Sequence, residues 1–159
     1  MSVAHPLPRP GGPADLCESD STLAAHDWRD LDDPAFIARW QALALQAAEP
    51  NPFYEPWCLL PALRTLDPRG HVRLLVLEAA GSVVGIMPVA TSALYYGYPL
   101  PHWRGWVHDN CFLGVALVAK GYECSFWRAA LDWIDCAATT PVSGTCARCR
   151  CPAPCTMRW

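Results

Sequence analysis

The sequence predicts an α/β protein built on a mixed sheet that is flanked by helices. Apolar residues recur at helical spacing in three segments, and compact apolar runs bounded by turn residues lie between them. Of the 159 residues, 52% are hydrophobic and 17% are charged, which is enough to bury a core. We expect that core between residues 28 and 135, because both ends of the chain have a different composition.

Two helices are expected early in this region, joined by a proline-rich turn. An aspartate before Pro34 supplies an N-cap, and a helix with one apolar face should end by Glu49. A second helix should open at Pro56 and run through about Leu66. The side chains expected to point inward from this second helix are Trp57, Leu60 and Leu63.

The middle of the chain is expected to form strands. The apolar runs 72–78 and 83–91, separated by a glycine turn, predict a β-hairpin. Pro88 has no amide to donate, so its strand should be an edge strand or carry a bulge there. Residues 94–101 read as an aromatic turn-rich segment and 110–118 as a third strand. Helical spacing returns over 123–137 and predicts the last helix.

Both ends of the chain are expected to lie outside the folded domain. Residues 1–27 are rich in Pro, Gly, Ser and Asp, which predicts a flexible leader. Residues 136–159 hold five of the nine cysteines, three prolines and three arginines but no Leu, Ile, Phe, Tyr, Asp, Glu or Lys. Such a segment cannot build a core. Its composition is typical of a GC-rich gene read in the wrong frame, so we interpret it as an unstructured, frameshift-derived tail.

Charge and hydropathy exclude several classes of partner. The formal net charge is −3 and the basic residues are scattered, which predicts neither a nucleic-acid nor an anionic-membrane partner. Arg73, Glu78 and Pro88 interrupt the most apolar region, so no membrane span is expected. The N-terminus lacks the layout of a secretory signal. A cytoplasmic location is therefore expected.

The cysteines of the tail allow a second hypothesis. Cys146, Cys149, Cys151 and Cys155 contain one Cys-x2-Cys pair, which would suit a small zinc-stabilised interaction module. A structural zinc site usually needs a second pair beyond a chain reversal, and here the other cysteines crowd the first pair. We therefore expect no metal in this chain.

Four residues are candidates for a substrate groove. Glu55 would orient an amine or accept its proton, or it complements the dipole of the helix that follows. His108 beside Asp109 suits an oriented base, or a loop histidine next to a capping aspartate. Tyr96 belongs to an aromatic cluster that would either floor a groove or pack in the core. The other members of that cluster are Tyr95, Tyr98, Trp103 and Trp106.

Several short motifs follow one another between residues 28 and 135: 51–57 (NPFYEPW), 59–63 (LLPAL), 81–89 (GSVVGIMPV), 99–102 (PLPH), 108–110 (HDN) and 112–118 (FLGVALV). In this order they make residues 28–135 resemble bacterial acyltransferases of the GNAT fold, in particular the CelD-like and FemAB-like group often labelled cellulose-biosynthesis acetyltransferases.

This resemblance implies a partial GNAT-like fold and transfer of an acyl group from acetyl-CoA or another acyl-CoA to an amine acceptor. In FemAB relatives the donor is an aminoacyl-tRNA. Family members contain two GNAT-like halves, and the phosphate loop that grips the donor follows [RQ]-x-x-G-x-[GA]; this pattern occurs here only at 9–14 (RPGGPA), in the proline-rich leader and not in residues 28–135. The resemblance thus covers an N-terminal half that binds no cofactor itself and is inactive alone. Without its companion half, we expect self-association through exposed sheet edges. A noncatalytic half that pairs with a partner chain is the remaining alternative.

Overall fold

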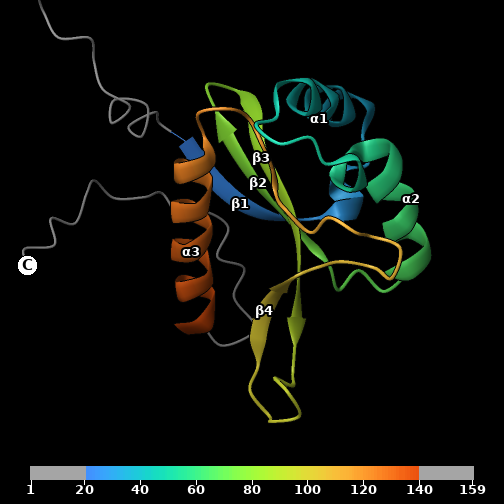
Figure 1. The fold of residues 1–159 in the computed structure, drawn as a ribbon, viewed down its shortest axis with the longest axis vertical. Helices are drawn as coiled ribbons and strands as arrows, with labels where there is room; N and C mark the ends of the chain where they lie inside the picture. Colours follow the sequence, from blue (N-terminus) through green and yellow to red (C-terminus); the bar gives the residue numbers. More distant parts are fainter. Residues whose placement is uncertain (1–20, 140–159) are drawn as a thin grey trace, which may run out of the picture.

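The computed structural model describes residues 21–139, which form a mixed α/β domain (Figure 1). It contains a five-stranded open sheet whose ladders are all antiparallel, and three α-helices. The strands are β1 (Ser21–Asp27), β2 (Arg73–Ala79), β3 (Ser82–Ser92), β4 (His102–Gly105) and β5 (Leu117–Val118). The α-helices are α1 (Pro34–Gln46), α2 (Pro56–Leu66) and α3 (Glu123–Thr139), and two short 3-10 helices are η2 (Trp28–Leu31) and η3 (Pro52–Tyr54).

The sheet has the order β1-β2-β3-β4, and β5 also pairs with β3. β2 occupies one side of β3 along most of its length, so β4 and β5 must share the other side. β4 pairs with residues 89–92 and β5 with residues 85–86. β4 and β5 therefore act as one strand that is interrupted, and the chain leaves the sheet between them.

Helices cover both faces of the sheet. Figure 1 shows α1 and α2 on one side and α3 on the other. Between the sheet and the helix pair lie Trp40 and Leu43 of α1 and Leu63 of α2, all at most 2% exposed. On the α3 side, Phe126 is fully buried and lies directly over Gly85 of β3. Apolar side chains of the predicted strand runs are therefore buried on both faces of the sheet.

The helix predictions are confirmed in their main features. Asp33 caps α1 by accepting hydrogen bonds from the amides of Ala35 and Phe36 at 3.3 and 2.9 Å. α1 ends at Gln46, within the predicted limit of Glu49, and α2 spans the predicted residues. Trp57 is 64% exposed, so its predicted inward orientation is wrong. Its indole donates instead to the nearby carboxylate of Glu55.

Both predicted ends of the domain require correction. Residues 21–27 are not leader but form β1, which pairs along its whole length with β2. α3 continues through Thr139, so the helix crosses the expected boundary at Asp135. Residues 1–20 and 140–159, with the four tail cysteines of the zinc hypothesis, lie outside the described residues.

The prediction for Pro88 was wrong, and the reason concerns the interrupted strand. β3 lies inside the sheet, and its bulge falls at Val84, opposite Leu77 and Glu78 of β2, and not at Pro88. The carbonyl of Pro88 accepts a hydrogen bond from the amide of Trp106 at 2.8 Å, so its ring nitrogen faces the same outer side of β3. The proline is tolerated because β4 has ended there.

The segment after β3 differs from its prediction. β3 and β4 form a hairpin that extends well beyond the helices (Figure 1). At its tip Tyr95 and Tyr98 exchange backbone hydrogen bonds of 2.9 Å around Tyr96 and Gly97, which both have positive φ, as in a type I′ turn. Tyr96 is 85% exposed. The predicted strand over 110–118 is reduced to β5.

Asp27 at the end of β1 makes stability depend on pH. Burial opposes ionisation of Asp27, but the amide of Arg29 and the guanidinium of Arg73 outweigh it, so the pKa of this carboxyl lies below its ordinary value of 3.8. A depressed folded-state pKa stabilises the domain above pH 3.8 and this stabilisation is lost as pH falls through the folded pKa. We expect Asp27→Asn to flatten the acid limb of urea-unfolding free energy measured from pH 6 to pH 2. An unchanged acid limb would contradict this assignment.

Candidate functional site

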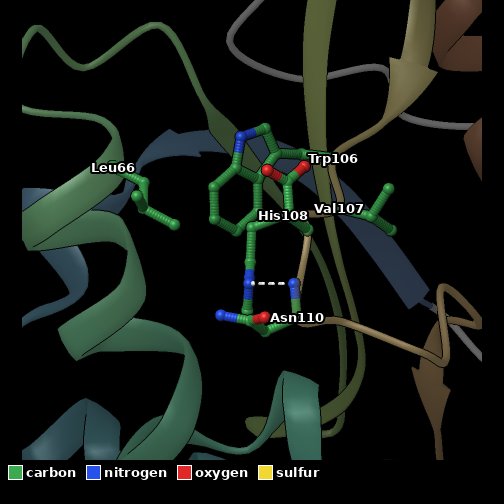
Figure 2. Close-up of a pocket in the computed structure, with 6 residues that line it drawn as sticks. Leu66, Trp106, Val107, His108 and Asn110 are labelled. Carbon is green, nitrogen blue, oxygen red and sulfur yellow. Dashed lines mark hydrogen bonds between the residues drawn. The ribbon is translucent and has the colours of Figure 1, made fainter.

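The segment that interrupts the outer strand, residues 106–116, forms the walls of a pocket. We call it the 106–116 loop. The pocket has a volume of about 270 Å³ and lies where the loop passes the C-terminal end of α2 (Figure 2). It is lined by Leu66, Trp106, Val107, His108, Asp109 and Asn110. An aromatic ring, an imidazole, a carboxylate and apolar groups therefore surround one space.

His108 is fixed by its own loop. Its Nδ1 accepts a hydrogen bond from the amide of Asn110 at 3.3 Å, so the neutral imidazole carries its proton on Nε2 (Figure 2). Nε2 is buried and has no hydrogen-bond partner among the described residues. The ring of Trp106 lies 5.7 Å from the imidazole. In this conformation His108 is a hydrogen-bond donor.

The predicted pairing of His108 with Asp109 is therefore wrong in its geometry. The partner that orients the imidazole is a backbone amide and not the neighbouring carboxylate. Asp109 itself is exposed and lines the same pocket. The two groups share a site, but they do not form an oriented acid–base pair.

Asn51, which precedes η3, holds the far end of the 106–116 loop. This side chain is 1% exposed, and its Oδ1 caps η3 through the amide of Phe53 at 3.1 Å. Its Nδ2 donates to the carbonyls of Leu113 and Val115 at 3.1 and 2.6 Å. A buried polar side chain is thereby satisfied on both of its ends.

Tyr54 holds the near end of the same loop. Its hydroxyl donates to the carbonyl of Trp106 at 3.0 Å, and its own carbonyl accepts from the indole of Trp40 at 2.9 Å. Burial, reinforced by the nearby Cys111, raises the pKa of the Tyr54 phenol, so it remains a donor at neutral pH. A Cβ atom at Gly114 would lie 2.9 Å from Cγ1 of Val107, so the loop has no room for a side chain at this position.

Two of the four sequence candidates lie away from this pocket. Glu55 is the N-cap of α2 but makes no capping hydrogen bond; its carboxylate accepts from Trp57 at 2.9 Å. Tyr96 sits at the exposed hairpin tip and packs edge-on against Tyr95. Of the remaining aromatic cluster, Trp103 packs against Trp133 of α3, and Trp106 lines the pocket.

The described cysteines do not build a metal site. No group of three or more His, Cys, Asp or Glu side chains suited to a metal occurs within residues 21–139. Burial, with the nearby Cys111 and Glu55, raises the pKa of the Cys58 thiol, which makes it a poor nucleophile. The thiol of Cys111 lies 3.4 Å from the carbonyl of Leu113 and packs inside the loop.

Asn51, Tyr54 and Leu66 also contribute to this site, and none of them was predicted from the sequence as a site residue. Asn51 and Tyr54 stand in the segment that carries the family resemblance, but a hydrogen bond to a loop more than 50 residues later has no local signal.

In the described part of the chain, no helix is long and apolar enough to cross a bilayer. Comparisons with protein-family models, with curated proteins and with solved structures each found no match for this chain.

Proposed function

We propose that this domain is the acceptor-side half of a GNAT-type N-acyltransferase, and that its pocket receives the amine. The observation that carries the proposal is the convergence of Trp106, His108 and Asp109 on one pocket at the interruption of the outer strand. The acyl-CoA would be held by a companion half, since residues 28–135 contain no match to the phosphate-loop pattern that grips it.

The pocket suits an amine with an apolar stem. The exposed carboxylate of Asp109 would attract an ammonium group, and the indole of Trp106 adds an aromatic face for the same cation. Leu66 and Val107 would contact the methylene groups. The pocket volume of about 270 Å³ is that of a small ligand site.

Acyl transfer needs little covalent chemistry from this half. The ammonium first loses one proton to solvent; the neutral amine then attacks the thioester carbonyl, a carbon–nitrogen bond forms, the carbon–sulfur bond breaks, and a second amine proton leaves with the coenzyme A thiol. Holding the amine in place is the contribution that a positioned pocket makes to such a step. His108 carries its proton on the buried Nε2 and its Nδ1 is bonded to the Asn110 amide, so it would shape the pocket rather than accept the amine proton.

Binding of an amine tests this site directly. We expect butane-1,4-diamine to shift the indole resonance of Trp106 in a ¹H–¹⁵N spectrum, and Asp109→Asn to weaken binding about fivefold, the effect of one exposed charge pair. Glu78→Gln is the matched control, because Glu78 is an acidic residue paired with Arg39 and does not line the pocket. Equal affinity of the D109N and E78Q variants, or no binding by the wild-type chain, would refute the pocket assignment.

A noncatalytic half that pairs with a partner chain is the second candidate. Its support is the β3–β4 hairpin, on which Leu94, Tyr98 and Leu100 are each more than half exposed. Such a surface is typical of an interface. Both candidates require a companion, and amine binding at the pocket distinguishes them.

A further inference from the structure

We infer that Asn51 and Tyr54 are positioning residues that clamp the two ends of the 106–116 loop and so give the pocket its shape. The catalytic meaning of this clamp depends on the proposed function, but the clamp itself does not. No hydrogen bond joins the two ends of the loop to each other among those described; both ends are instead bonded to the short segment that contains η3.

The clamp at Tyr54 replaces a sheet hydrogen bond that Pro88 cannot make. Val89 pairs with Gly105, so Pro88 and Trp106 stand opposite each other in the ladder. The amide of Trp106 donates to the carbonyl of Pro88 at 2.8 Å, as in a hydrogen-bonded antiparallel pair. The return bond would need an amide on Pro88, which proline lacks. The hydroxyl of Tyr54 donates to the Trp106 carbonyl in its place at 3.0 Å.

This exchange of partners sets the direction in which the chain leaves the sheet. The amide of Trp106 still bonds to β3, but the carbonyl of Trp106 bonds to Tyr54. The residues that line the pocket come next in the chain. Tyr54 is itself fully buried and held by the indole of Trp40. The helix layer therefore fixes the position of Tyr54, and the end of the loop that is bonded to Tyr54 is fixed with it.

The clamp at Asn51 acts on the other end through its donors alone. Its Oδ1 serves the local 3-10 helix, whereas both Nδ2 bonds go to carbonyls of the loop. The two functions can be separated, because aspartate keeps the acceptor and loses the donors. Between the two clamped ends the loop turns on itself through the amide of Cys111 and the carbonyl of His108 at 2.8 Å. His108 is thus held between two fixed points.

The test is the rate at which diethyl pyrocarbonate modifies His108 in the full chain, read residue by residue by mass spectrometry. The exposed His71 is the internal reference, because it reacts in every variant. In the wild type the lone pair of Nδ1 is occupied by the Asn110 amide and Nε2 is buried, so His108 should be protected. We expect modification of His108 to rise about fivefold in Tyr54→Phe, the effect of one lost hydrogen bond, and about tenfold or more in Asn51→Asp.

Two further variants keep the inference falsifiable. Leu23→Ala destabilises the domain at β1 without touching the loop, and its His108 should stay protected relative to His71. Adding Pro88→Ala to Tyr54→Phe restores an amide opposite the Trp106 carbonyl and should lower the His108 rate again. Equal rates in N51D and L23A, or no recovery in the double variant, would overturn the clamp. Failure of butane-1,4-diamine to bind the wild type would instead refute only the proposed function.

Discussion

Replacing Trp40 by alanine is expected to lower the free energy of unfolding by about 3–5 kcal/mol, the usual cost of truncating a buried tryptophan. Trp40 is fully buried on α1, packs edge-on against Phe36, and donates its indole proton to the carbonyl of Tyr54. The alanine variant would lose this packing and leave that carbonyl without its donor. Because small domains have only about 5–15 kcal/mol in total, a large fraction of the stability would be lost.

Urea unfolding followed by circular dichroism measures this loss. Trp40→Phe is the matched control, since it keeps most of the ring volume and loses chiefly the hydrogen bond, at a cost of about 1–2 kcal/mol. Trp127, which is 44% exposed on α3, provides a tryptophan that should be replaceable by alanine at much lower cost. A W40A variant no less stable than W127A would contradict the placement of α1 against the sheet.

The second large effect is expected at Gly85, where α3 approaches the sheet most closely. A Cβ atom at this position would lie 2.4 Å from Cδ2 of Phe126, and that ring is fully buried. Neither the ring nor the strand can move freely, so Gly85→Ala should cost about 1–3 kcal/mol, or more, through overpacking. Phe126→Leu should make the alanine less harmful, which gives a favourable coupling in a double-mutant cycle.

Gly105 is the matched control for this prediction. A Cβ there would meet only the terminal Cε of Met87 at 3.0 Å, the end of a flexible side chain. Gly105→Ala should therefore change the unfolding midpoint much less than Gly85→Ala. If both substitutions had the same effect, or if F126L and G85A were simply additive, the close contact between α3 and β3 would be disproved.

The helices and the central hairpin could be predicted from the sequence because their signals are local. An aspartate before Pro34, a proline at position 56 and apolar residues at helical spacing all lie within the elements that they specify. The hairpin β2–β3 is similarly marked by two apolar runs around Gly81. Each of these elements carries its own start, stop and buried face.

The edge strands could not be predicted in this way. β1 has only Leu23 fully buried, and its polar ends read as part of the leader; pairing with the apolar β2 makes it a strand. β4 is short and directly follows the proline-containing segment 94–101, and no strand was predicted over its residues. Pairing with a neighbouring strand decides whether such a segment becomes a strand, and strand propensity alone is a weak guide.

The pocket could be predicted only in part. His108 and Asp109 were found because their chemistry is visible in one short motif, and the fold places both at the pocket. Glu55 lies at the opposite terminus of α2 from Leu66 and Tyr96 at a hairpin tip, so neither lines the pocket; the sequence has no local signal for where the pocket forms. The roles of Asn51 and Tyr54 depend on an interruption of the outer strand that only the paired sheet reveals.

The most direct test of the proposed acceptor half is a paired titration of the full chain, in which the indole resonances are followed while acetyl-CoA and then butane-1,4-diamine are added. The account predicts that acetyl-CoA alone leaves the spectrum unchanged, that the amine shifts Trp106, and that no acetylated amine accumulates. Binding of acetyl-CoA with release of free coenzyme A thiol and formation of the acetylated amine by this chain alone would contradict it.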